Sequence, residues 1–200
     1  MKLRHLEMKL ERLSGIEKPD VSLEQYVTPA TVAARMLFSA FMNGDIEGRR
    51  VCDLGCGAGV LSCGAALLGA GHVSGIDIDE NAVSTARGNA SLLGVDVEFI
   101  VGDISLTEML KCDTVVMNPP FGAQKKYADR PFIDAALSCA EVVYGIFNAG
   151  SLPFVEAYTK DRAHVEWVVT CEFPVKHTFS HHTKECVDIN VKIICLSVNK

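Results

Sequence analysis

The residues with the clearest chemical meaning are Asn118-Pro119-Pro120-Phe121, which directly follow the apolar run 113–117. Proline has no backbone N–H, so two consecutive prolines end a strand and stiffen the turn that follows it. Such a turn holds the Asn118 side-chain oxygen and the Pro119 carbonyl still, aimed at a planar amino group, while the Phe121 ring stacks on the attached base. The two acceptors stabilise positive charge that develops on the nitrogen. The turn is therefore a candidate catalytic site for an amino or amide nitrogen, and a stiffened strand exit is the alternative.

A glycine-rich turn lies upstream, in Asp53-Leu54-Gly55-Cys56-Gly57-Ala58-Gly59, between an expected strand and an expected helix. Glycines allow a tight turn and let the backbone approach a ligand at the carboxyl edge of a parallel sheet. No Lys-Ser or Lys-Thr follows these glycines, which excludes a Walker-type phosphate loop. The spacing of the glycines alone leaves a dinucleotide site open.

Aspartates follow two further expected strands and point to one cofactor. Asp77 is placed to accept hydrogen bonds from both ribose hydroxyls, and Asp103 is placed to accept from an adenine amino group. Asp53 is expected to order the glycine turn and to contact an ammonium group indirectly. Each aspartate alone would serve as a helix N-cap, which is the role we expect for Asp79. The joint pattern at three consecutive strand ends favours S-adenosylmethionine.

The elements that position these residues predict an α/β fold. Strands and helices alternate with short loops, which implies parallel strands, right-handed crossovers and helices on both sheet faces. The expected strands are 51–54, 73–76, 97–101, 114–117 and 142–147, and the expected helices are 3–15, 29–43, 60–68, 81–93, 132–140 and 152–158. Two final runs, 165–171 and 187–198, predict an antiparallel hairpin around the loop 174–185. The elements therefore predict a mostly parallel seven-stranded sheet.

Size and composition bound the remaining possibilities. The 200 residues, with 48% hydrophobic residues and a mean hydropathy of +0.20, predict one domain, with a helical cap over 1–45 and a core over 46–200. No apolar stretch is long enough to span a bilayer, and the N-terminus lacks a signal-peptide core. The eight cysteines contain no Cys-x-x-Cys pair, so we expect free thiols in a reducing cytoplasm and no metal site. A net charge of −6 argues against coating nucleic acid by charge alone.

The glycine turn, Asp77, Asp103 and Asn118-Pro119-Pro120-Phe121, in this order, resemble the Rossmann-like methyltransferases that modify exocyclic or amide nitrogens. Over nearly the whole chain, the sequence resembles the methyltransferase-like protein 5 family. The segments that carry this narrower resemblance are 23–28, 33–37, 53–61, 68–71, 77–80, 117–122 and 187–189.

The resemblance implies a Rossmann-like class I methyltransferase fold, a function, a cofactor and a partner. It implies methylation of N6 of one adenosine in small-subunit ribosomal RNA, with S-adenosylmethionine as the cofactor and a small zinc-binding methyltransferase activator protein as the partner. It implies cofactor contacts from Gln25, Thr28, Gly55, Ala58, Val60, Asp77, Asp103 and Ile104; with Asp53, Gly57 and Gly59 from the glycine turn, these form the expected cofactor site.

Three further groups of residues are expected to meet the RNA or the partner. Tyr26 or Phe132 is expected to form the wall opposite Phe121. Lys125, Lys126 and Arg130 follow the catalytic turn and are expected to contact RNA phosphates, a solvated loop being the alternative. Val97, Phe99 and Val101 belong to the edge strand in the usual strand order of this fold. That edge is the expected dock for the activator, and burial under the domain's own helices is the alternative.

Three other functions fit the same residues. A glutamine N5-methyltransferase that acts on a translation factor uses the same Asn-Pro-Pro geometry, but such enzymes generally carry tyrosine in place of Phe121. A guanine-N2 RNA methyltransferase is the second alternative, because related motifs also end in phenylalanine. A cofactor-binding assembly factor without turnover is the third, although the intact Asn118, Pro119 and Phe121 argue against it.

Overall fold

The computed structural model describes residues 1–17, 19–20, 23–105, 111–122, 127–176 and 186–199. Their strands form one sheet of seven in the order β3-β2-β1-β4-β5-β7-β6. The strands are β1 Arg50–Leu54, β2 His72–Asp77, β3 Glu98–Val101, β4 Thr114–Met117, β5 Val142–Asn148, β6 Ala163–Lys176 and β7 Cys186–Val198. The first five are parallel, and β7 runs antiparallel between β5 and β6. This confirms the expected mostly parallel sheet with a C-terminal antiparallel hairpin.

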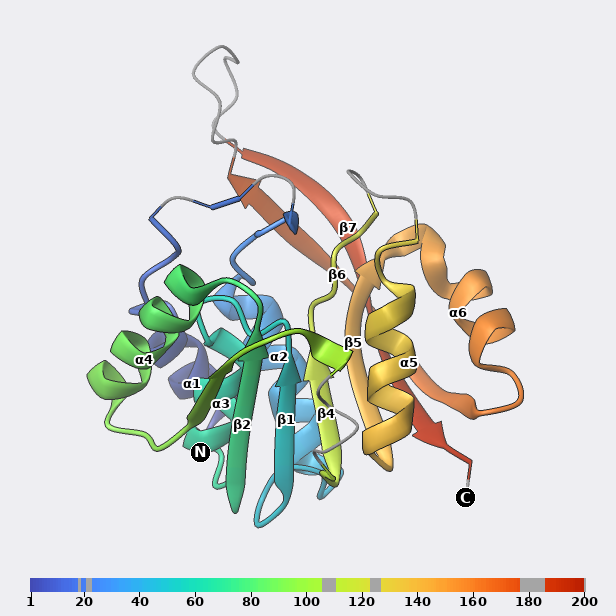
Figure 1. The fold of residues 1–200 in the computed structure, drawn as a ribbon, viewed down its shortest axis with the longest axis horizontal. Helices are drawn as coiled ribbons and strands as arrows, with labels where there is room; N and C mark the ends of the chain where they lie inside the picture. The colour runs from blue at the N-terminus through green and yellow to red at the C-terminus, as the bar shows by residue number, and fades with distance from the viewer. Residues whose placement is uncertain (18, 21–22, 106–110, 123–126, 177–185, 200) are drawn as a thin grey trace.

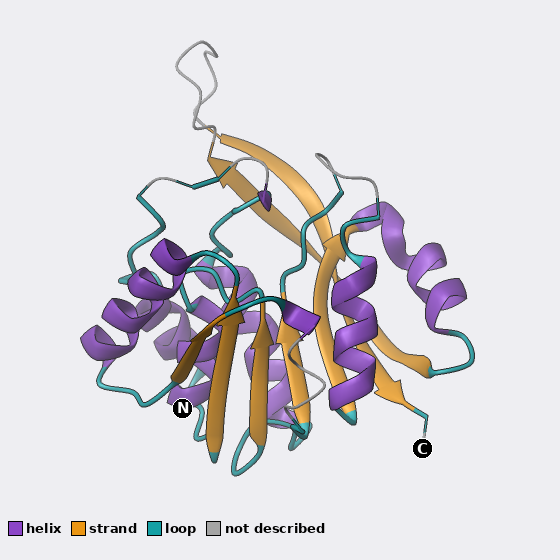
Figure 2. Cartoon of the chain, viewed as in Figure 1, coloured by secondary structure: helices purple, strands orange, loops and turns teal. Residues whose placement is uncertain are grey.

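Helices cover both faces of the sheet (Figures 1 and 2). They are α1 Leu3–Leu10, α2 Ala30–Met42, α3 Val60–Leu67, α4 Glu80–Leu93, α5 Arg130–Cys139 and α6 Leu152–Thr159, with a short 3₁₀ helix η3 at Ala149–Ser151. On one face, α1 to α3 pack on the strands in one apolar cluster, and α4 packs beside α3 in another. On the other face, α5 and α6 pack in a third cluster. None of the described helices is long and apolar enough to cross a membrane.

The ends of the helices follow local signals in most cases. Asp79 caps α4 by accepting a hydrogen bond from Asn81 N at 2.9 Å, as expected, and Gly94 ends the same helix with φ 64°. The first helix is shorter than expected, because it ends at Leu10 rather than near residue 15. Both backbone groups of Ser14 bond to the Asn89 side chain at 2.9 Å, and this tertiary contact replaces the helical hydrogen bonds.

The C-terminal hairpin is longer than the sequence predicts. Its pairing continues through Pro174↔Asp188 to Lys176↔Cys186, where we expected a loop from residue 174. A proline is tolerated there because β6 is an edge strand and leaves one side of its backbone unpaired. Figure 1 shows the two strands extending past the carboxyl ends of β1, β2 and β4, so the hairpin lies beside that edge of the sheet.

The cysteines pack as small apolar side chains. The seven whose side chains the structure describes are free and buried. Cys112, just before β4, and Cys139, the last residue of α5, lie with their Sγ atoms 4.0 Å apart. These thiols therefore contribute to the core rather than to a cross-link.

Candidate functional site

A cavity of about 380 Å³ opens at the carboxyl ends of β1, β2 and β4. Such an edge is where open α/β sheets bind ligands. Residues 23–28, which precede α2, form part of the wall, and the start of α5 forms another part. In Figure 1 the chain between α1 and α2 passes over these strand ends. Distant parts of the chain therefore converge on one cavity of a size typical for a small ligand.

Backbone hydrogen bonds hold the glycine turn at the bottom of this cavity. The amides of Gly55 and Cys56 both donate to Ile76 O, at 2.9 and 3.0 Å. Gly57 N donates to Asp77 Oδ2 at 2.8 Å, and Asp79 N donates to the other Asp77 oxygen at 3.0 Å. Asp77 therefore orders the turn and joins it to the end of β2.

The structure corrects the role expected for Asp53. Its Oδ2 accepts hydrogen bonds from Ser62 N at 2.9 Å and from Ser62 Oγ, within α3, and not from the glycine turn. Side chains alternate along β1, so Asp53 shares the α3 face of the sheet with Val51. Its second oxygen, Oδ1, is buried and has no hydrogen-bond partner among the described residues.

These groups fit S-adenosylmethionine. Asp53 lines the cavity, and its unpaired Oδ1 is suited to a positively charged donor such as an ammonium group. Gly57 also lines the cavity, with φ 52°, and a Cβ built on it would meet no atom within 4 Å. A carboxylate oxygen without a partner and a glycine that faces open space are the features expected of a cradle for this ligand.

Burial raises the pKa of Asp53 to about 7, and its hydrogen bonds to Ser62 only partly oppose this. A cationic ligand group favours the ionised carboxylate, so binding releases a proton when the pH is below 7. We expect cofactor affinity to rise with pH between about pH 5.5 and 7, by up to about tenfold per unit. Isothermal titration calorimetry in two buffers of different ionisation enthalpy measures the affinity and the released proton together. Affinity and proton release that match those of Asp53→Asn across this range would contradict the assignment.

The N-terminal segment is anchored to Asp79, the cap of α4. Gln25 Nε2 donates to Asp79 Oδ2 at 2.9 Å, and Gln25 Oε1 accepts from Asp20 N at 2.7 Å. Gln25 lines the cavity, but both ends of its amide are bonded to the protein. The structure therefore shows Gln25 as the residue that ties segment 23–28 to the start of α4.

The Asn-Pro-Pro-Phe turn presents one polar atom to the cavity. Asn118 and Pro120 line the cavity, and Asn118 Nδ2 donates to Thr28 Oγ1 at 3.0 Å. Asn118 Oδ1 is buried and has no partner among the described residues. An oxygen held in this way is ready to accept a hydrogen bond from an N–H group of a bound substrate.

The aromatic residue of the turn lies elsewhere than expected. Phe121 packs edge-on against Phe173 of β6, with ring centroids 6.0 Å apart at 74°, and it is not among the residues that line the cavity. Phe132 does line the cavity and its ring lies against the glycine turn, where a Cβ on Gly55 would come within 2.8 Å of Cε1. The ring walls of the cavity therefore come from Tyr26, Phe132 and Tyr127.

Most of the predicted site residues meet in this cavity. Those that line it are Gln25, Tyr26, Thr28, Asp53, Gly55, Gly57, Ala58, Val60, Asp77, Asp103, Ile104, Asn118, Pro120 and Phe132. Those that do not are Gly59, Pro119, Phe121 and Arg130. Gly59 instead precedes α3 with φ 78°, where a Cβ would lie 2.9 Å from that of Ala86. Lys125 and Lys126 lie outside the described residues.

Two residues of the site, Tyr127 and Glu24, are not predicted by the sequence motifs. Tyr127 lines the cavity, is 49% exposed and has φ 67°, and the Arg130 guanidinium carbon lies 3.9 Å from its ring centroid. Arg130 is thus covered by an aromatic ring rather than exposed. Glu24, also in the wall, accepts a hydrogen bond from Gly122 N at 3.1 Å. The position of Tyr127 soon after the Asn-Pro-Pro-Phe turn is its only signal in the sequence, and no local pattern indicates Glu24.

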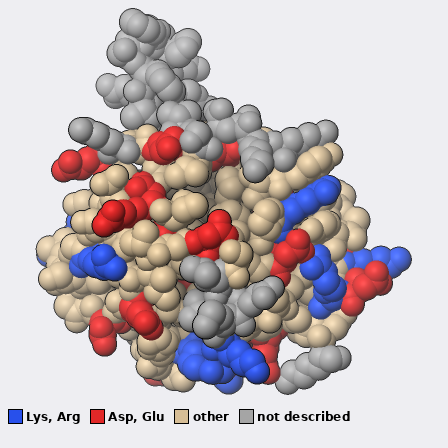
Figure 3. Space-filling model, viewed as in Figure 1, with Lys and Arg blue, Asp and Glu red and all other residues tan. Residues whose placement is uncertain are grey.

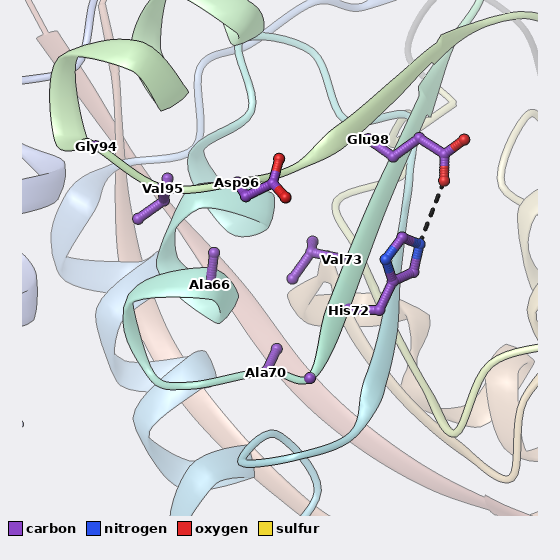
Figure 4. A pocket seen from close by; sticks show the side chains of 9 residues that line it. Ala66, Ala70, His72, Val73, Gly94, Val95, Asp96 and Glu98 are labelled. Carbon is purple, nitrogen blue, oxygen red and sulfur yellow. Dashed lines mark ion pairs between the residues drawn. The ribbon is translucent and has the colours of Figure 1, made fainter.

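A second cavity, of about 400 Å³, lies at the amino ends of β2 and β3 (Figure 4). Its wall consists mainly of small apolar residues and glycines around His72, Asp96 and Glu98. His72 Nε2 lies 3.3 Å from a Glu98 oxygen, and both side chains are more than half exposed. In the described part of the chain, no group of three or more His, Cys, Asp or Glu is placed to hold a metal ion. The cavity at the carboxyl edge is the candidate site, because most of the predicted site residues line it.

The fold and this site define a Rossmann-like, S-adenosylmethionine-dependent methyltransferase. The family described as Methyltransferase small domain matches residues 30–143. The rRNA N6-adenosine methyltransferase METTL5 of Danio rerio is 37% identical over 97% of this chain and 98% of its own. The uncharacterised protein MJ0284 of Methanocaldococcus jannaschii is 38% identical over 96% and 93%. The crystal structure of PH1948 from Pyrococcus horikoshii superposes with a TM-score of 0.92 at 37% identity and covers 100% of this chain and 99% of that one.

The chain therefore belongs to the Methyltransferase small domain family and, within it, to the methyltransferase-like protein 5 family. This confirms the resemblance that the sequence motifs indicate, and S-adenosylmethionine is its cofactor.

Proposed function

We propose that this protein methylates N6 of an adenosine in small-subunit ribosomal RNA. The observation that carries the proposal is the buried, unpaired Asn118 Oδ1 beside the cofactor cavity. That atom accepts a hydrogen bond from any amino or amide N–H, so it fits adenine, guanine and glutamine alike. The relatives named as rRNA N6-adenosine methyltransferases favour adenine among the three.

The protein mostly positions and polarises the reacting nitrogen. The cofactor supplies a methyl group bonded to a positively charged sulfur. The methyl carbon is a strong electrophile, because the sulfur leaves as a neutral thioether. Asn118 Oδ1 accepts a hydrogen bond from the adenine amino group, and the Pro119 carbonyl is the proposed second acceptor. The nitrogen lone pair then leaves conjugation with the ring, and the developing positive charge is stabilised. No dedicated base is needed, because the amino proton becomes acidic once the nitrogen is methylated and passes to water.

The target base must leave its helix or junction before it can enter this cavity. The cavity offers the exposed ring of Tyr26 and the ring of Tyr127 near the Asn118 turn, with Phe132 on the glycine-turn side. We propose that the adenine stacks on one of these rings. Phe121 would then support the turn through its contact with Phe173 and would not stack on the base.

We propose that the RNA is not held by the described face of the protein through a broad basic surface. Acidic and basic side chains are interspersed over the described part of the face seen in Figure 3, and the net charge is −6. We propose that Lys125 and Lys126 contact phosphates close to the target, while Arg130 supports Tyr127. The remaining attraction would come from a partner or from the ribosomal particle. We further propose that the chain acts as one domain in the cytoplasm.

The proposed partner is a small zinc-binding methyltransferase activator that pairs with the edge strand β3. Val101 is 44% exposed, but Phe99 is buried, so the Phe99 ring does not form the dock that we expected. Gly102 N donates to Asp77 O of β2, so the backbone N–H groups of Phe99 and Val101, one residue out of phase, face the open edge. Arg87 Nη2 donates to Phe99 O at 2.8 Å and covers part of this edge. Docking would therefore use backbone groups rather than a row of apolar side chains.

Val101→Pro is expected to weaken binding of the activator at least about tenfold, because proline removes an N–H that faces the partner and not β2. Surface plasmon resonance with the candidate activator measures the affinity, and the melting temperature reports on the fold. Val101→Thr keeps the N–H and serves as the matched control. Unchanged binding by the proline variant would place the partner on another surface.

Transfer from isotopically labelled S-adenosylmethionine to unmodified small-subunit RNA tests the function, followed by nucleoside mass spectrometry. The assay is run with and without the activator, and a release factor is offered in parallel. Labelled N6-methyladenosine is the expected product. Labelled N2-methylguanosine would show that guanine is the substrate. Label in the release factor would favour glutamine methylation, and no label in either would favour a non-catalytic assembly factor.

A further inference from the structure

One hydrogen bond sets the direction in which the catalytic amide points. Asn118 Nδ2 donates to Thr28 Oγ1 at 3.0 Å, and Thr28 is 8% exposed. The carboxamide is planar, so placing its nitrogen against Thr28 directs its oxygen to the other side. That oxygen, Asn118 Oδ1, is the buried atom without a partner that borders the cavity.

The opposite orientation of the amide would defeat the proposed chemistry. It would present the Asn118 NH₂ group to an incoming amino group, and two donors would face each other. The Thr28 hydroxyl can accept or donate, so the substrate N–H selects the orientation in which the Asn118 oxygen faces it, and in that orientation Thr28 Oγ1 pairs the Asn118 NH₂ group. Without that acceptor, the productive orientation would bury an unpaired N–H donor, which costs about 1–3 kcal/mol.

Segment 23–28 also holds the far end of the same turn. Gly122, directly after Phe121, donates its N–H to the buried carboxylate of Glu24 at 3.1 Å, and Glu24 has φ 51°. A non-glycine residue with positive φ is costly, so surrounding contacts must hold it in place. Segment 23–28 therefore forms hydrogen bonds to both ends of the Asn-Pro-Pro-Phe turn. Gln25 in turn bonds this segment to Asp79.

We propose that Thr28 is a positioning residue whose hydroxyl oxygen fixes the Asn118 amide with Oδ1 toward the substrate nitrogen. This deepens the proposed function and rests on it for its effect on turnover. The role is distinct from the cofactor contact that the family resemblance implies for the same residue. Thr28 acts on the rate of methyl transfer through Asn118, and it does not touch the reacting atoms.

The test compares Thr28→Val, which keeps the shape and removes the hydroxyl, with Thr28→Ser, which keeps the hydroxyl. For the valine variant we expect kcat on the RNA to fall by about tenfold to a hundredfold, from the cost of an unpaired donor. We measure kcat at saturating S-adenosylmethionine, so that a lost cofactor contact of Thr28 changes Kd and not kcat, and we expect serine to restore kcat. Thr28→Ala repeats the loss of the hydroxyl if the valine variant does not fold.

A second measurement needs no RNA. In protein with ¹⁵N-labelled asparagine side chains, the Asn118 NH₂ protons should exchange slowly in the wild type and in Thr28→Ser, and fast in Thr28→Val. If valine retains kcat at saturating cofactor, or retains slow exchange of the Asn118 NH₂ protons, the proposal is wrong. If the wild type forms no N6-methyladenosine, the proposed function fails, while the exchange measurement still decides the role of Thr28.

Discussion

Asn118→Ala is expected to lower kcat for RNA methylation by about 10²- to 10³-fold, with the Kd for S-adenosylmethionine within about twofold of the wild type. Alanine removes the Asn118 side-chain oxygen, which is buried and has no hydrogen-bond partner among the described residues. The rest of the turn is held by Pro119 and Pro120, so the cofactor cavity should keep its shape. Single-turnover kinetics with labelled cofactor measures the chemical step, and calorimetry measures the binding.

Asn199→Ala is the matched control, because Asn199 is exposed and lies after β7, at the opposite edge of the sheet from Asn118. It loses the same side-chain atoms and should keep wild-type kinetics. Full activity of Asn118→Ala with normal cofactor binding would remove the amide oxygen from the mechanism. A parallel loss of cofactor affinity would instead make Asn118 part of the cofactor site.

Gly57→Ala is expected to weaken S-adenosylmethionine binding by at least about tenfold. The new methyl group would enter the open space beside Gly57 in the cavity wall, where the cofactor has to approach the backbone. The substitution should also strain the turn, because Gly57 has φ 52° and its N–H bonds to Asp77. Calorimetry measures the Kd, and the melting temperature measures the cost to the fold, which is about 1–2 kcal/mol for such backbone strain.

Gly44→Ala separates the two effects. Gly44 follows α2 with φ 83°, faces open space as Gly57 does, and does not line the cavity. Its alanine variant should carry the same backbone strain and bind the cofactor normally. If both variants weaken binding equally, the effect at Gly57 is one of stability and the glycine turn does not approach the cofactor.

Local patterns in the sequence predicted the sheet and the edge that carries the site. Strand β4 has the bounds that its apolar run predicts, and α4 begins at the Asp79 cap and ends at Gly94, because these signals act within one turn of the chain. The ends that were predicted wrongly are those that distant contacts determine. The first helix stops early because Asn89 bonds to Ser14, and β6 continues because β7 pairs with it.

The sequence by itself determined the class of fold, the glycine turn and the Asn-Pro-Pro-Phe turn, because each depends on residues that are neighbours in the chain. Only the tertiary structure decided how these residues are held. Thr28 meets Asn118 across 90 positions and Glu24 meets Gly122 across 98, and no local periodicity reports such contacts. The same holds for the two oxygens of Asp53, of which one binds α3 and the other is unpaired, since burial and packing set their partners.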